Sequence, residues 1–344
     1  MPDNISILEL IQNIDQNSTG GGLKRCIHTY DDIISLENLL EAWQEFLKGK
    51  RNKKDVQEFQ LNLMDNIFSL HNELKNKTYK HGPYHAFNIS DPKPRNIHKA
   101  TVRDRLLHHA IYRVLYPYFD KKFISDSYSC RLNKGTHKAL ERFKQFGNRV
   151  SKNNTKQCFI LKCDIKKFFA NIDHQILLNI LDKHIEDKDI LWLLETVIKS
   201  FNPGLPLGNL TSQLLVNIYM NEFDQFIKHK LKVKHYIRYA DDFVAFACDS
   251  KYLTLILESM REFLTNKLKL TLHPDKIFIK TISSGLDFLG WVHFPTHRVL
   301  RTVTKRRMLK NLNEENKDSY LGMLKWGNTY KLQEHINNYQ HFSV

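Results

Sequence analysis

The sequence predicts an α+β fold in which the strands form a sheet with helices on one face. Short apolar runs with strand character alternate with longer segments whose apolar residues recur at helical spacing. From residue 158 the predicted order is strand, helices, strand, strand, helix and strand, which suits a split βαββαβ arrangement. At 344 residues the chain is also too long for a single compact core, so we expect two or three subdomains.

Helical spacing dominates the first part of the chain. Apolar residues recur with this spacing from Ser35 to Leu47 and from Asp55 to Leu74, which predicts two helices that can pack as a hairpin. Residues 76–97 then predict two strands. Pro92 and Pro94 keep the second of these strands out of the centre of a sheet.

Two further helices are predicted before the main sheet. Apolar residues at helical spacing run from Asp104 to Tyr118. Another helix is expected to start at Gly135 and to run through Phe146. We expect Thr136 to be its N-cap, because a threonine hydroxyl can accept a hydrogen bond from the first turn of a helix.

The strands of the main sheet are predicted after residue 157. The mostly apolar run Cys158–Ile165 predicts a strand that ends in an acid, Asp164. The aromatic-rich runs His235–Ala240 and Phe243–Cys248 predict a hairpin with two adjacent acids at its tip. The remaining predicted elements are helices at 172–185, 189–199, 210–229 and 252–268, a strand pair at 270–281, a strand or hairpin at 286–294, and basic helices after Arg298.

The charge balance indicates a polyanionic partner. The chain has 52 Lys and Arg against 37 Asp and Glu, a net charge of +15 and a pI near 9.4. An anionic membrane surface is the second candidate, but the sequence shows no amphipathic anchor, no signal peptide and no apolar run of roughly 18 residues. The five cysteines show no CxxC spacing, so we expect buried thiols, a cytoplasmic location and no membrane partner.

Asp241 and Asp242 occupy the predicted hairpin turn. Aspartate is common in turns, so the pair on its own most often marks a turn. The strand that ends in Asp164 can lie beside the hairpin, and three carboxylates would then repel one another unless cations sit among them. Two Mg²⁺ ions about 3.5–4 Å apart would offset this repulsion and would suit a phosphoryl transfer, with Mn²⁺ as the expected substitute.

Six blocks of the sequence, taken in chain order, resemble those of bacterial reverse transcriptases. Tyr239-Ala240-Asp241-Asp242 resembles the YxDD box, and the segment from Asp164 to Asp173 resembles the first palm motif. The other blocks are 93–97 with 102–106 in the fingers, 204–213 over the template, 272–276 in the motif D region and 288–291 in the primer grip.

The resemblance covers residues 90 to 295 and implies a right-hand polymerase fold. It also implies an RNA-directed DNA polymerase that makes cDNA from template RNA and dNTPs. The implied parts are a helical N-terminal extension at 1–90, fingers at 91–157, a palm at 158–295 that includes some elements of the fingers, and a short helical thumb at 296–344.

The resemblance further implies roles for individual residues. Asp164, Asp241 and Asp242 would bind the metal ions, with the Ile165 carbonyl as an added ligand. The residues implied in nucleotide binding are Lys93 and Arg95 on the triphosphate, Phe169 as the bulky residue that rejects a 2′-hydroxyl, Gly208, Gln213, and Lys276 as proton donor to pyrophosphate. The residues implied in primer and template contacts are Tyr239, Arg103, Arg105, Leu289, Gly290, Trp291, Lys305, Arg306, Arg307 and Lys310.

Several of these roles have a plainer alternative. Phe169 can equally be a packing residue of the core, and for Tyr239 and Trp291 core packing is the favoured alternative. For Lys93, Arg95 and Lys276 the alternative is a solvated surface charge.

The block over the template departs from the pattern of most reverse transcriptases, which carry Gln-Gly and Ser-Pro there. This sequence has Leu207-Gly208 and Ser212-Gln213. The change resembles the diversity-generating retroelement branch, whose members misincorporate opposite template adenines. That branch implies a small basic accessory protein that forms a ring. A phage-defence enzyme or another retron-like or group II-like reverse transcriptase is an alternative, and a non-catalytic RNA-binding scaffold is an alternative of another class.

Overall fold

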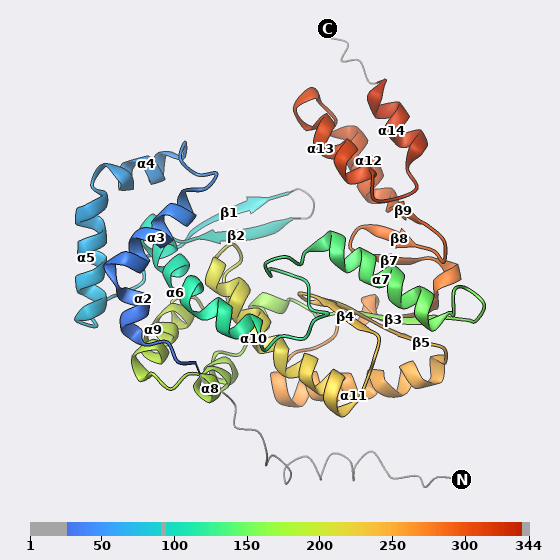
Figure 1. Cartoon of the computed structure of the whole chain (residues 1–344), viewed down its shortest axis with the longest axis horizontal. Coiled ribbons are helices and arrows are strands. Elements are labelled where there is room, and N and C mark those ends of the chain that lie inside the picture. The colour runs from blue at the N-terminus through green and yellow to red at the C-terminus, as the bar shows by residue number, and fades with distance from the viewer. Residues whose placement is uncertain (1–25, 91–93, 339–344) are drawn as a thin grey trace.

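A four-stranded antiparallel sheet lies at the centre of the computed structural model, which describes residues 26–90 and 94–338. Its strands are β3 (Phe159–Asp164), β4 (Tyr236–Tyr239), β5 (Asp242–Ala247) and β6 (Phe278–Thr281), in the order β4-β5-β3-β6 (Figure 1). Every neighbouring pair is antiparallel. This strand order is that of a split βαββαβ arrangement, as the sequence predicts.

Helices cover both faces of this sheet, so the prediction of helices on one face is wrong. Figure 1 shows α7 (Thr136–Val150) on one side and α11 (Ser250–Leu268) on the other. Ile160 of β3 lies in the core cluster that contains α7 side chains, whereas Leu161 lies in the cluster that contains α11 side chains. Strand β3 is buried on both faces because its apolar run is interrupted only by Lys162 and shows no alternation of apolar and polar residues.

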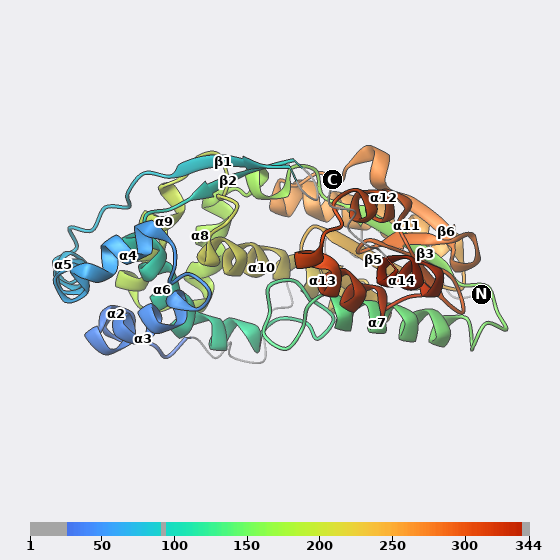
Figure 2. The same cartoon turned by 90° about the horizontal axis from the view of Figure 1, so that it is seen from above.

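A helical part lies at one end of the elongated molecule (Figure 2). Its side chains share one hydrophobic core with those of α8 to α10, which connect β3 to β4, so residues 26–90 have no separate core. No helix of the described residues is long and apolar enough to cross a lipid bilayer. The elements are α2 (Tyr30–Ile34), α3 (Leu36–Leu47), α4 (Lys54–Leu61), α5 (Leu63–Lys75), the hairpin of β1 (His85–Ile89) and β2 (Arg95–Lys99), α6 (Val102–Asp120), α8 (His174–His184), α9 (Lys188–Lys199) and α10 (Leu210–Gln225), which a π-helical turn (Phe226–Lys230) extends.

The single helix predicted from Asp55 to Leu74 is two helices, α4 and α5. The chain leaves the helical conformation at Asn62, which has φ of −117° and ψ of 41°. The Asn66 side-chain amide donates to the Phe59 carbonyl at 2.9 Å and so satisfies a carbonyl at the end of α4. The apolar spacing continues across this break, and for that reason the sequence pattern does not reveal it.

The strand pair predicted at 270–281 does not form as a pair. Leu272 bridges to Ile165, and β6 pairs with β3, so both segments pair with the same strand and not with each other. A 3₁₀ turn, Pro274–Lys276, separates them.

The C-terminal part combines a small sheet with helices. The hairpin predicted at 286–294 forms, but a third strand comes before the first helix, so the prediction of helix directly after Arg298 is wrong. This strand forms because Arg298 and Leu300 pair with His293 and Trp291. The elements are β7 (Leu286–Phe288), β8 (Trp291–His293), β9 (Arg298–Leu300), α12 (Thr302–Lys310), α13 (Glu314–Leu324) and α14 (Tyr330–Asn337).

Candidate active site

Two strand ends bring the three predicted acids together. The register of β3 and β5 places Asp164 directly opposite Asp242. The backbone amide of Ile165 donates to the carbonyl of Asp241 at 3.1 Å, so this acid lies beside the same strand end. Asp164, Asp241 and Asp242 therefore meet at one edge of the main sheet, although 77 residues separate the first acid from the second.

A buried arginine holds the turn that carries Asp241. Ala240 has φ of +55°, a left-handed conformation that costs a non-glycine residue about 1 kcal/mol or more. Arg238 Nη1 donates to the Ala240 carbonyl at 3.2 Å. Arg238 is fully buried and forms an ion pair with the equally buried Asp224, with 2.7 Å between Nη2 and Oδ2. This pair fixes the backbone next to the acids.

The pair of Arg238 and Asp224 is not among the residues that the sequence pattern predicts for the site. Arg238 also donates to Asn217 Oδ1 at 3.2 Å and to Ser127 Oγ at 3.1 Å, and the Tyr236 hydroxyl donates to Asp224 at 2.9 Å. A signal is present in the sequence, because an arginine inside an apolar strand requires buried partners. The identity of those partners depends on the fold.

Burial raises the pKa of two of the acids. It is the main cause of the raised pKa of Asp241, and the negative charge of Asp164 adds to it. The pKa of Asp242 rises to about 7, again mainly through burial, with Asp164 and Asp241 as further causes and Lys162 as an opposing one. Asp242 Oδ1 is buried without a hydrogen-bond partner among the described residues. A bound cation would relieve both the repulsion and the unmet acceptor.

Two lysines contact these acids. Lys276 Nζ lies 2.9 Å from Asp164 Oδ1, and Lys162 Nζ lies 3.5 Å from Asp242 Oδ2. Lys162 also donates to the backbone carbonyl of Asp287 at 2.6 Å and so connects β3 to the start of the C-terminal sheet. Within the described ranges, no three His, Cys, Asp or Glu side chains are grouped as a ready metal site. The ammonium groups of Lys276 and Lys162 therefore balance part of the negative charge of the three carboxylates.

The turn after Asp164 carries Phe169, the predicted steric gate. Phe169 is half-buried in a 3₁₀ turn, Phe168–Asn171, and its carbonyl accepts a hydrogen bond from the Leu205 amide at 2.8 Å. Gly204 allows this approach: its φ is +70°, and a Cβ there would lie 2.2 Å from the Phe169 carbonyl oxygen. The loop expected over the template is therefore fixed against the turn that carries Phe169.

Strand β2 packs against the same loop. The His98 amide donates to the Leu207 carbonyl at 3.0 Å. Gly208 has φ of +111°, and a Cβ there would lie 2.9 Å from Ile97 Cγ2. The β1–β2 hairpin and the 204–213 loop thus form one packed unit.

The other predicted nucleotide-binding residues have different positions. Arg95, at the start of β2, is exposed, and its positive charge opposes the raised pKa of Asp241, so it lies within electrostatic range of the acids. Gln213 is half-buried in the first turn of α10. Lys276 is held by Asp164, and Lys93 lies outside the described residues.

The predicted N-cap Thr136 has another partner. The Thr136 hydroxyl lies 3.1 Å from the hydroxyl of Tyr239, one of the residues expected at the primer. The N-cap of α7 is Gly135, with φ of +93° and no side-chain cap, so the prediction of Thr136 as the cap is wrong. The Thr136 side chain instead contacts Tyr239, the last residue of β4.

The predicted primer-grip residues form the tip of the β7–β8 hairpin. Leu289 and Gly290 both have positive φ, +51° and +86°. Trp291 is only 4% exposed and packs in the core of the C-terminal part, under Gly327. The Trp291 ring is therefore buried, as expected if this residue packs in the core.

The basic residues expected at primer and template fall into two groups. Arg103 forms an ion pair with Glu73, and Arg105 forms one with Asp55 at 2.5 Å, so both guanidinium groups tie α6 to other N-terminal helices. On α12, Lys305, Arg306 and Lys310 are exposed, and Arg307 is half-buried.

Comparisons with known proteins agree with this geometry. The profile of the family described as "Reverse transcriptase (RNA-dependent DNA polymerase)" matches residues 80–293, more than half of the chain. Protein YkfC of Escherichia coli (strain K12) is 26% identical over 254 residues, which cover 62% of this chain and 65% of that protein. The group II intron-encoded protein LtrA of Lactococcus lactis subsp. cremoris is 26% identical over 294 residues, which cover 63% of this chain and 48% of that protein. The chain thus spans about half to two thirds of the length of these two curated relatives.

Solved structures show the same fold. Telomerase from Candida albicans, in complex with a fragment of telomeric RNA, superimposes with a TM-score of 0.51 at 12% identity, covering 73% of this chain and 51% of that chain. Truncated telomerase from Candida tropicalis gives a TM-score of 0.50 at 13% identity, covering 67% of this chain and 59% of that chain. The predicted fold class, an α+β right-hand polymerase, is confirmed. The chain belongs to the reverse transcriptase (RNA-dependent DNA polymerase) family.

Proposed function

We propose that the chain is an RNA-directed DNA polymerase that extends a primer with dNTPs on an RNA template. The observation that carries this proposal is the meeting of Asp164, Asp241 and Asp242 at one strand edge, next to the Phe169 turn, in a member of this family. The division into fingers at 91–157, palm at 158–295 and thumb at 296–344 is part of the same proposal.

The donor atoms of the site fit Mg²⁺. Carboxylate oxygens are the ligands that this hard cation prefers, and Asp242 Oδ1 is a buried acceptor without a partner among the described residues. We assign Asp164, Asp241, Asp242 and the Ile165 carbonyl to two Mg²⁺ ions, which Mn²⁺ can replace. Such ions supply activation of the primer 3′-hydroxyl and neutralisation of the triphosphate.

The protein's own groups complete the site. Arg95 and Lys93 would orient the triphosphate, since a guanidinium binds phosphate in a bidentate manner. Phe169 would exclude a 2′-hydroxyl from the sugar position. Lys276 Nζ, once released from Asp164, would donate a proton to the leaving pyrophosphate.

The test replaces one acid. We expect Asp241→Asn to reduce cDNA synthesis about 100-fold or more on a primed RNA with dNTPs and Mg²⁺, because the loss of a metal ligand removes several kcal/mol of transition-state stabilisation. The fold should persist, because the change removes a half-buried negative charge that repels Asp164. Asp65→Asn, which alters an exposed acid of α5, is the control and should remain active. Full activity of Asp241→Asn would overturn the metal assignment.

We propose further that this polymerase belongs to the diversity-generating retroelement branch and works with a small basic accessory protein that forms a ring. The support is the Leu207-Gly208 and Ser212-Gln213 block, because Leu207 cannot make the hydrogen bonds that an amide side chain would offer near the incoming nucleotide. The second hypothesis is another bacterial reverse transcriptase, of group II-like or defence type. A group II intron-encoded protein is among the relatives of this chain.

Sequencing of cDNA distinguishes these hypotheses. With cognate RNA and accessory protein, we expect errors concentrated opposite template adenines. Faithful copying at adenines would favour the second hypothesis. RNA binding by the unchanged protein without any DNA synthesis would favour the non-catalytic scaffold.

A further inference from the structure

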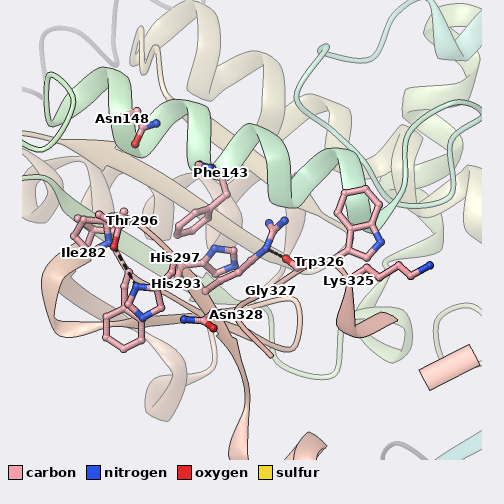
Figure 3. A pocket seen from close by; sticks show the side chains of 14 residues that line it. Phe143, Asn148, Ile282, His293, Thr296, His297, Lys325, Trp326, Gly327 and Asn328 are labelled. Carbon is pink, nitrogen blue, oxygen red and sulfur yellow. Dashed lines mark hydrogen bonds between the residues drawn. The ribbon is translucent and has the colours of Figure 1, made fainter. Parts of the chain in front are cut away.

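A cavity of about 270 Å³ lies between α7 and the C-terminal part of the chain (Figure 3). Side chains of α7, of the turn at 294–297 and of the turn at 325–328 line it together with Ile282. The Ile282 amide donates to the Cys158 carbonyl at 2.9 Å, so the cavity lies at the end of β3 opposite to Asp164. At about 3.4 Å per residue, the two ends are roughly 20 Å apart. The cavity is therefore separate from the active site.

The lining of this cavity is positively charged. Lys144, Arg298 and Lys325 line it, together with His297, and no Asp or Glu is among the described residues that line it. Lys144 and Lys325 are exposed, and neither takes part in the ion pairs found among the described residues. Glu141 acts on Arg298 from outside the lining. The net positive charge of the lining suits the binding of a phosphate group.

The same cavity offers aromatic and amide groups. Trp326 and Phe294 are half-buried, and each lies beside a histidine ring, that of His137 at 4.0 Å from Trp326 and that of His297 at 5.0 Å from Phe294. The amide side chains of Asn148, from α7, and Asn328 are on opposite sides of the cavity in Figure 3. Aromatic rings stack on unpaired bases, and amides can hydrogen-bond to base edges.

The cavity wall is fixed by hydrogen bonds. Arg298 Nε donates to the Trp326 carbonyl, and the backbone N–H of Asn328 donates to the Arg298 carbonyl at 2.8 Å. The 325–328 turn is therefore tied to β9, while the opposite wall belongs to α7. A ligand in the cavity would contact both parts and would stabilise their relative position.

We propose that this cavity binds one unpaired nucleotide of single-stranded RNA, with the phosphate at Lys144 and Lys325 and the base among the aromatic and amide groups. Its volume is below the roughly 300–1,000 Å³ of pockets for drug-sized ligands, so it holds no more than one nucleotide. A paired base is excluded because its faces are already stacked within the duplex. The inference rests on the proposed function, which supplies RNA as the partner.

The experiment compares two charge reversals of equal size. Binding of a fluorescein-labelled ten-residue oligouridine is measured by fluorescence anisotropy. We expect Lys144→Glu with Lys325→Glu to weaken binding about tenfold or more. The control, Lys183→Glu with Lys251→Glu, changes exposed lysines of α8 and α11 by the same net charge and should bind within about twofold of the unchanged protein.

Photocrosslinking provides an independent measurement. An oligouridine that carries 4-thiouridine should crosslink to a peptide that contains Phe294 or Trp326. Equal weakening by both double variants, or crosslinks that map only elsewhere, would overturn the proposal. Primer extension by the unchanged protein is measured separately, and failure there would count against the proposed function and not against the cavity.

Discussion

At the scale of single residues, the geometry of the Asp241 turn depends on Arg238. Its guanidinium bonds to Asp224 through both Nε and Nη2 and reaches the Ala240 carbonyl through Nη1. We predict that Arg238→Lys keeps the charge pair but loses the bond to Ala240, because one ammonium cannot replace a planar fork. We expect kcat to fall about tenfold or more with a smaller change in KM for dNTP, measured by steady-state primer extension.

The matched control for Arg238 is Arg131→Lys. Arg131 is also nearly buried, pairs with Asp120 at 2.7 Å and donates to the carbonyls of Ile124 and Ser127, and none of its hydrogen bonds among the described residues reaches the turn. We expect this variant to lose stability in thermal unfolding without a matching loss of kcat. An equal fall in kcat for both variants would show that Arg238 acts only through stability.

The buried imidazole of His108 predicts a loss of stability in acid. Its Nε2 lies 3.3 Å from His81 Nε2, and its Nδ1 has no hydrogen-bond partner among the described residues. Burial, with the charge of His81 as a further cause, lowers the pKa of His108 from 6.5 to about 3. The unfolded chain therefore binds a proton that the folded chain does not, so the stabilisation is complete above pH 6.5 and falls as the pH drops towards 3.

Because of this proton uptake by the unfolded chain, the free energy of unfolding should fall by about 2 kcal/mol between pH 7 and pH 5. Urea unfolding at the two pH values measures it. We expect His108→Leu to reduce the pH dependence by that amount, whereas His85→Leu, at an exposed position of β1, should leave it unchanged. A pH dependence that is the same in all three proteins would contradict the prediction.

At the scale of elements, the turn between α13 and α14 packs closely against Trp291 of β8, within the core of the C-terminal part. A Cβ on Gly327 would lie 2.0 Å from the Trp291 ring, so Gly327→Ala must displace the ring or the turn. We predict a loss of about 1–3 kcal/mol, the usual cost of overpacking a core, measured by chemical unfolding. Gly322→Ala is the control: a Cβ there meets nothing within 4 Å, and in the last turn of α13 it should stabilise by at most about 0.5–1 kcal/mol.

Elements with a strong local pattern were predictable, and those defined by packing were not. The β4–β5 hairpin follows from its two aromatic-rich runs with acids between them, and it forms as predicted. The break at Asn62 was not predictable, because the apolar spacing continues through it, while the non-helical backbone of Asn62 and the bond from Asn66 to the Phe59 carbonyl appear only in the fold. Strand β9 likewise depends on pairing with β8, which no pattern in three residues can reveal.

At the scale of the whole molecule, the net charge of +15 predicts salt-sensitive binding of nucleic acid. Binding that neutralises phosphates releases counterions, so the logarithm of the affinity should fall linearly with the logarithm of the salt concentration. For about six phosphate contacts we expect a loss of roughly 10³-fold between 50 and 200 mM salt for a primed RNA. Fluorescence anisotropy over a salt series measures the slope, and an affinity that does not change with salt would contradict this account.

The sequence by itself determined the chemistry and its chain order. Acids at the end of one apolar strand and at the tip of a later hairpin are local patterns, and with the ordered blocks around them they were sufficient to predict a polymerase fold. Only the tertiary structure decided which side chains surround those acids. The contacts of Lys162 with Asp242 and of Lys276 with Asp164 and the pairing of Arg238 with Asp224 join residues that are 14 to 112 positions apart. Such contacts depend on strand register and helix packing, and no short stretch of sequence contains that information.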